Sequence, residues 1–169
     1  MKHLKKIALR GSLAAGLLCG TMAGASAADI ERVYGANAMS PIAAGVSVPP
    51  GYTTYYISGA LPSPVPPATP GTPANYGDMT QQTRSVLENL KATMDKMGVS
   101  FGDVVAAHVF LDPSADFPAM NKVWGTEFGT ATQPNKPARA AFRTNALVLQ
   151  GALLEIEFIA AKKVSVKKK

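Results

Sequence analysis

Segment 153–161 reads LLEIEFIAA, and its alternation of apolar and acidic residues constrains the fold more than any other feature of the chain. In an extended strand, successive side chains point to opposite faces. Leu154, Ile156 and Phe158 therefore share one face, while Glu155 and Glu157 share the other. A strand of this kind needs a sheet with one face covered by another layer. The segment thus predicts a two-layer domain.

A helix that can supply this cover follows Asp78. Asp78 is a good N-cap, Gln81 stands three residues further on as in a capping box, and Gly98 supplies the stop. The side chains at helical spacing between these ends predict the stripe that packs on the core. They are Met79, Thr83, Val86, Leu87, Leu90, Met94 and Met97.

A second helix is predicted from about Ser114 to Phe128. Phe117, Asn121, Trp124 and Phe128 fall on one face of it. Asn121 is thus a polar group in an apolar stripe, and a buried amide without a partner costs about 1–3 kcal/mol. We therefore expect a partner for Asn121, either a neighbouring backbone segment or a ligand.

Three further strands are predicted at 53–58, 104–111 and 139–144. With the two helices and the final strand they predict an α+β fold, in which two helices pack on one face of a mixed sheet. The other face of the sheet still carries apolar groups. Self-association is the simplest way to cover them.

The N-terminus has the pattern of a cleavable signal peptide. A basic start precedes a mostly apolar run that closes with Ala25-Ser26-Ala27, and Arg10 leaves that run shorter than a membrane span. The alternative is an uncleaved membrane anchor. Residues 1–27 are thus predicted to be a signal, 28–161 the domain and 162–169 a basic tail. Cys19, the only cysteine, would leave with the signal, and the mature protein would be periplasmic or secreted without stable membrane anchoring.

Signal removal also changes the charge. The chain carries a net +6, but residues 28–169 hold 13 basic and 11 acidic residues, a net charge of +2. Part of that excess is Lys167 to Lys169, which we interpret as a solvated end, with a patch for anionic surfaces as the alternative. A nearly neutral body does not indicate a nucleic-acid partner. Six prolines in 61–73 predict a stiff surface loop; they are Pro62, Pro64, Pro66, Pro67, Pro70 and Pro73.

Most catalytic constellations are missing from the chain. It has no glycine-rich phosphate loop, HExxH, CxxC or nucleophile elbow, and His108 is the only histidine after residue 27, which favours a core or interface histidine. What remains is Arg139 on one predicted strand, which we expect to lie next to Glu155 on another. Arginine can hold a carboxylate through two hydrogen bonds, and a carboxylate can activate water. A salt bridge across paired strands is the alternative. Arg143 has the same strand parity as Arg139.

Several short motifs occur in an order and spacing that resemble the RidA (YjgF) family of reactive-intermediate deaminases, over about residues 38–161. They are Ser58-Gly59, Gln82-Thr83 through Asn89-Leu90 with Gly98, Phe117-x-x-x-Asn121, Pro137-Ala138-Arg139 and Glu155-Ile156-Glu157-x-Ile159-Ala160. The resemblance implies a chorismate-mutase-like domain assembled as a homotrimer, with clefts between subunits.

The resemblance also implies the chemistry. Arg139 would grip the carboxylate of a 2-imino or enamine acid, and Glu155 would hold the attacking water, giving a 2-oxo acid and ammonia without a cofactor or metal. Ser58, Gly59 and Asn121 would shape the cleft.

Three positions depart from the family pattern, and one of them is Ala60, which follows Ser58-Gly59 where the family commonly has Gln. Ala141 stands where the family often has a cysteine, and the backbone at this position would then bind the substrate. Ile42 stands where the family often has an aromatic residue that lines the cleft. The alternatives are a carboxylate-binding protein that uses the same cleft without turnover, and a ribonuclease or translation inhibitor. A nearly neutral body without a histidine pair argues against the last.

Overall fold

A computed structural model of the chain describes residues 28–37, 39–66 and 71–164. The predicted signal at 1–27, Pro67, Pro70 and residues 165–169 of the predicted tail lie outside the described residues. None of the described helices has the length and apolar character that a membrane span requires. The described parts of the proline-rich segment contain no helix or strand, as predicted.

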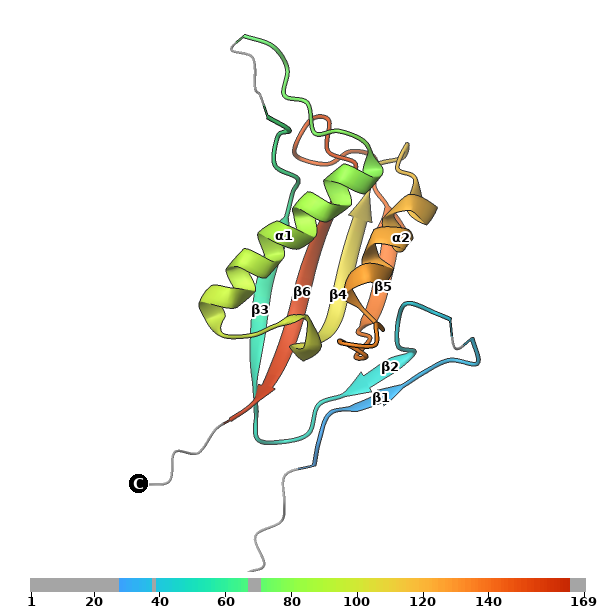
Figure 1. Cartoon of the computed structure of the whole chain (residues 1–169), viewed down its shortest axis with the longest axis vertical. Coiled ribbons are helices and arrows are strands. Elements are labelled where there is room, and N and C mark those ends of the chain that lie inside the picture. The colour runs from blue at the N-terminus through green and yellow to red at the C-terminus, as the bar shows by residue number, and fades with distance from the viewer. Residues whose placement is uncertain (1–27, 38, 67–70, 165–169) are drawn as a thin grey trace, which may run out of the picture.

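Four strands form the main sheet, in the order β3-β6-β4-β5 (Figure 1). Their bounds are Tyr52–Ala60 for β3, Leu154–Lys163 for β6, Val104–Leu111 for β4 and Ala138–Arg143 for β5. Strands β4 and β5 are parallel, and the other two pairs are antiparallel. The sheet is therefore mixed, as predicted, and β4 separates β5 from β6.

Two helices cover one face of this sheet (Figure 1), which confirms the α+β prediction. They are α1, Met79–Met97, and α2, Phe117–Glu127. A short 3-10 turn at Phe101–Asp103 leads into β4. Near the N-terminus, β1 (Glu31–Val33) and β2 (Gly45–Ser47) form a separate antiparallel pair.

The alternation of β6 directs its apolar side chains into the core. Leu154, Ile156 and Phe158 are buried beneath the helices, whereas Glu155 and Glu157 are half-buried on the other face. Each buried side chain of this size contributes about 1.5–3 kcal/mol. The strand continues to Lys163, two residues beyond the predicted end, because β3 pairs with it there.

Helix α1 begins and ends where the sequence predicts. The Asp78 side chain accepts a hydrogen bond from the Gln81 backbone N–H, and the Gln81 side chain accepts one from the Asp78 N–H, each at 2.9 Å. Gly98 ends the helix in a left-handed conformation, with φ of 72°. The predicted stripe is buried except for Met97, which is exposed because it lies in the last turn, beyond the end of the core.

Asp78→Ala removes the N-cap of α1. We expect a loss of about 1 kcal/mol in the free energy of unfolding, because one backbone N–H loses its acceptor. Urea denaturation measures this loss, and Glu88→Ala, at an exposed position within the same helix, is the control. An unchanged midpoint for Asp78→Ala would show that water replaces the cap without cost.

Helix α2 begins three residues later than predicted. The Asp112 side chain accepts hydrogen bonds from the backbone N–H and the hydroxyl of Ser114, so Ser114 belongs to a turn. Asp116 then acts as the N-cap and accepts from the Ala119 N–H at 3.1 Å. The sequence offers two aspartates that can cap, and only the second one starts the helix.

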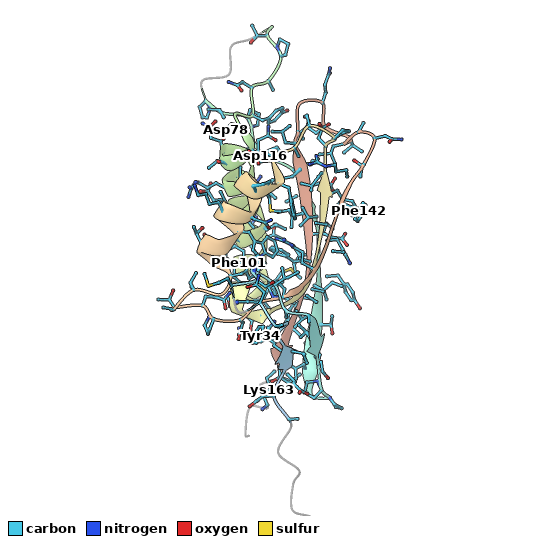
Figure 2. The ribbon with its side chains drawn as sticks, turned by 90° about the vertical axis from the view of Figure 1, so that its right-hand side faces the viewer. Tyr34, Asp78, Phe101, Asp116, Phe142 and Lys163 are labelled. Atoms are coloured by element: carbon cyan, nitrogen blue, oxygen red, sulfur yellow. The ribbon has the colours of Figure 1, made fainter. Side chains whose placement is uncertain are left out.

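The second face of the sheet has no covering layer among the described residues. Figure 2 shows Phe142 on the side opposite the helices, where its ring contacts that of Phe110 at 4.9 Å between centroids. Tyr56 is 76% exposed. His108 lies on β4, and its Nδ1 is 2.6 Å from Glu157 Oε1. His108, the only histidine among the described residues, therefore pairs with Glu157 at a half-exposed position.

Candidate functional site

Arg139 lies on β5 and reaches toward α2. Its Nη2 donates a hydrogen bond to Asn121 Oδ1 at 2.7 Å. The guanidinium carbon lies 4.6 Å from the ring centroid of Trp124 and 5.6 Å from that of Phe117. The three helix residues face Arg139 because they follow one another at offsets of four and three along α2. Asn121 thus has a partner, as expected, but it is an arginine side chain and not the backbone segment or ligand that the sequence suggested, because Arg139 of β5 reaches α2.

The second terminal nitrogen of Arg139 is not satisfied. Nη1 is buried and has no hydrogen-bond partner among the described residues. Burial lowers the pKa of Arg139 to about 10, so the group keeps its charge at neutral pH. A buried charged donor without an acceptor is costly, and a planar carboxylate matches the guanidinium fork. This arrangement is suited to binding an anion.

Glu155 lies on the opposite face of the sheet, against Gly59. A Cβ added to Gly59 would lie 2.9 Å from Glu155 Cδ and closer still to its Oε1. The register of β3 against β6 shifts between Ile57 and Ala60, so this close approach occurs at an irregularity of the strand. Gly59 thus leaves room for the Glu155 carboxylate, and its neighbour Ser58 is exposed.

One copy of the chain does not bring Arg139 and Glu155 together. Arg139 is in register with Ala107 on the helix-covered face, whereas Glu155 is in register with Phe110 on the uncovered face. Strand β4 also stands between them. The expectation that they are neighbours is therefore wrong within one copy, and so is the alternative of a salt bridge across paired strands.

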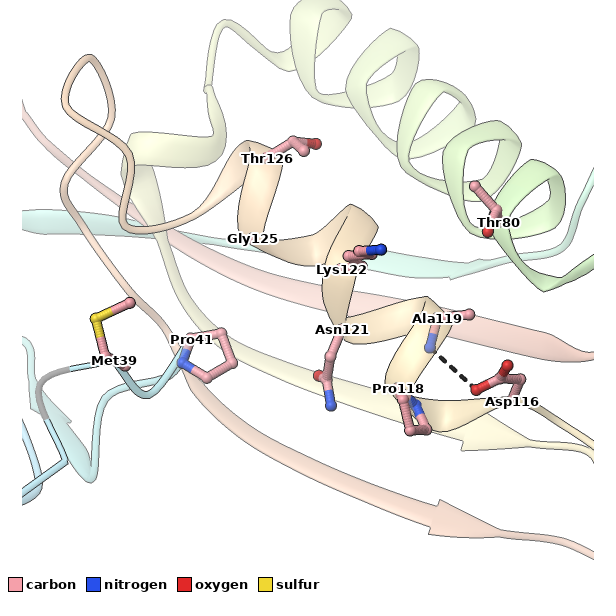
Figure 3. A pocket seen from close by; sticks show the side chains of 10 residues that line it. All are labelled: Met39, Pro41, Thr80, Asp116, Pro118, Ala119, Asn121, Lys122, Gly125 and Thr126. Carbon is pink, nitrogen blue, oxygen red and sulfur yellow. Dashed lines mark hydrogen bonds between the residues drawn. The ribbon is translucent and has the colours of Figure 1, made fainter.

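A hollow of about 740 Å³ opens beside α2 (Figure 3). Met39 and Pro41 line one side of it, and Asn121, Lys122 and Thr126 line another. The Trp124 indole N–H donates to the carbonyl of Pro41 at 3.0 Å and so holds this segment against the helix. Asn121 lines the hollow and also binds Arg139, which itself does not line it.

Sequence reasoning placed Phe117 and Trp124 in a core stripe and missed their contact with Arg139. The sequence did indicate such a contact, because the apolar stripe includes Asn121, and a polar residue in that stripe needs a partner on the facing strand. Ala141, two residues after Arg139, is exposed on the edge strand. In the described ranges, no three His, Cys, Asp or Glu side chains gather as a metal ion requires.

The fold and this group of residues define an α+β domain with a half-buried arginine suited to an anionic small molecule. The family model described as endoribonuclease L-PSP matches residues 37–162. The chain is 36% identical to a RutC family protein of Pyrococcus horikoshii over 132 residues, which is 78% of this chain and 98% of that protein. The chain therefore belongs to the endoribonuclease L-PSP family, which is also called the RidA, YjgF or RutC family.

Two further relatives extend the comparison. The 3-aminoacrylate deaminase RutC of Acinetobacter baylyi is 34% identical over 120 residues, covering 71% of this chain and 88% of that protein. The crystal structure of a YjgF family member from Neisseria meningitidis aligns with a TM-score of 0.54 at 23% identity, covering 81% of this chain and 98% of that one. At this level of identity, the similarity to the Neisseria meningitidis structure shows the fold alone.

Proposed function

We propose that the protein hydrolyses 2-imino or enamine acids to 2-oxo acids and ammonia. The observation that carries the proposal is the half-buried guanidinium of Arg139, whose buried Nη1 lacks an acceptor that a substrate carboxylate would supply. The family and the deaminase relative support the reaction class. The small 2-imino acids 2-iminopropanoate and 2-iminobutanoate are the substrates we propose.

The reaction needs orientation more than activation, because an imine carbon is already electrophilic. Arg139 holds the carboxylate and fixes C2 in the cleft. Glu155 accepts a proton from water as the water oxygen bonds to C2, and this proton passes to the imine nitrogen. In the resulting carbinolamine the hydroxyl proton passes to the amino nitrogen, C2=O forms, the C–N bond breaks and ammonia leaves. An enamine first gains a proton at C3 and loses one from nitrogen, which gives the imine.

We further propose that a second copy completes the site, within a homotrimer. Arg139 and Glu155 lie on opposite faces of one sheet, so neighbouring subunits must each supply one of them to a shared cleft. The exposed Tyr56 and Phe142 on the uncovered face support this assembly, because association would bury them. Ser58, Gly59 and Ala141 would contribute the cleft walls.

The test of the activity uses 2-iminopropanoate generated in situ, with its decay followed with and without enzyme. Acceleration by the wild type that is lost in a cleft variant supports the proposal. Calorimetric titration with pyruvate covers the alternative, since a binding protein would titrate without accelerating the decay. Absence of both acceleration and binding would sink the proposed function.

Gly59→Ala displaces the Glu155 carboxylate without removing it. The added Cβ would occupy the space of a flexible side-chain end, so the protein should fold normally while turnover falls about tenfold or more. Gly45→Ala, where a Cβ would meet nothing within 4 Å, is the matched control. Wild-type turnover for Gly59→Ala would show that the position of Glu155 against Gly59 is unimportant.

Export is a separate proposal, and it rests on the sequence of residues 1–27. We propose that cleavage follows Ala27 and releases the protein to the periplasm or the medium. Mass spectrometry of the native protein tests this directly. A mature chain that begins at Ala28 supports export, whereas a cytoplasmic chain that retains Met1 or Lys2 contradicts it.

A further inference from the structure

Arg143 lies four residues after Arg139 on the same strand, and its role is not explained by substrate binding. It is in register with Leu111, so it points to the helix-covered side, as its parity predicts. Its Nη1 donates to the carbonyl oxygens of Asp112 at 3.0 Å and Pro113 at 2.7 Å. Its Nη2 donates to the carbonyl of Ala115 at 3.0 Å.

These three carbonyls belong to the turn that starts α2. Residue 115 immediately precedes the N-cap Asp116, whose side chain fixes the first turn of the helix. Arg143 therefore ties the beginning of α2 to β5. Strand β5 carries Arg139, and α2 carries the residues that surround it. The distance between the two elements decides whether Asn121 can reach Arg139 at 2.7 Å.

We propose that Arg143 is a positioning residue, which sets α2 against β5 so that Asn121 holds the Arg139 guanidinium in its carboxylate-binding orientation. The effect on turnover rests on the proposed function, whereas the effect on Arg139 does not. The planar guanidinium of arginine can donate hydrogen bonds to three carbonyl oxygens at once, whereas the compact ammonium group of lysine cannot match this geometry. The same contacts argue against a second acidic group of the substrate as the partner of Arg143.

Trp124 provides the readout, because it is the only tryptophan of the chain and lies over Arg139. Arg143→Gln is compared with wild type in three measurements on the full chain. They are Trp124 emission without ligand, the Kd for pyruvate, and kcat and KM for 2-iminopropanoate. We expect a shifted emission and about a tenfold rise in Kd and KM, with kcat changing less.

Two controls separate positioning from general stability. Arg84→Gln removes an exposed arginine of α1 and should change none of these quantities. Val86→Ala lowers stability from within the core and should leave Kd and KM unchanged. Arg143→Lys keeps the charge and should fall between Arg143→Gln and wild type. If Arg143→Gln does not fold, the same measurements on Arg143→Lys test the positioning role.

The outcomes distinguish the two proposals. Wild-type emission and wild-type Kd in a less stable Arg143→Gln would overturn the positioning role. If the wild type neither binds pyruvate nor accelerates imine decay, the proposed function fails. Trp124 emission without ligand then still tests Arg143, because it reports the position of α2 against Arg139. An emission spectrum that is the same in all variants would end the proposal.

Discussion

Arg139→Met should lower kcat/KM for 2-iminopropanoate by roughly two to four orders of magnitude, because two charge-assisted hydrogen bonds to the carboxylate contribute about 1.5–3 kcal/mol each. The loss should appear as weak pyruvate binding as well as slow turnover. Steady-state kinetics and calorimetry measure the two effects. Arg84→Met, the same change at an exposed arginine of α1, should leave both unchanged.

The same variant should be at least as stable as the wild type. Burial lowers the pKa of Arg139, so the native state disfavours the charged form, and Nη1 has no acceptor in the described residues. Methionine removes this cost while keeping the contact with Trp124, and Asn121 can turn to the hollow. Thermal unfolding checks this expectation. A marked loss of stability with unchanged pyruvate binding would mean that Arg139 is structural.

Glu155→Gln should lower kcat by about 10²–10⁴ while pyruvate still binds, because glutamine keeps the shape but cannot accept a proton from water. Single-turnover measurements separate this chemical step from binding. Glu157→Gln is the matched control, since it makes the same change on the same strand and face. Equal loss in both variants would show that the charge of the face, not Glu155, supports turnover.

Local features of the fold follow from the sequence. The caps of α1 and the bounds of β4 agree with prediction, because capping residues and an uninterrupted apolar run determine them within a few residues. The start of α2 does not, because Asp112 and Asp116 both can cap, and the choice depends on how the turn packs. Met97 fits the helical stripe by spacing, but the core ends before it.

The arrangement of the candidate site could be predicted only in part. Strand parity correctly places Arg139 and Arg143 on one face, because both lie on β5. Parity cannot relate β5 to β6, since that relation depends on strand order and β4 lies between them. The expected meeting of Arg139 and Glu155 therefore failed within one copy, and the partner of Asn121 emerged only when α2 was placed over β5.

Because Arg139 and Glu155 lie on opposite faces of one sheet, the proposed reaction requires a cleft shared between subunits, and complementation tests this requirement. Arg139→Met and Glu155→Gln, each inactive alone, are coexpressed in equal amounts and purified as one assembly. If neighbouring subunits of a trimer share each site, random mixing restores about a quarter of the wild-type activity, because one site in four has both residues. No activity in verified mixed assemblies would contradict the shared cleft.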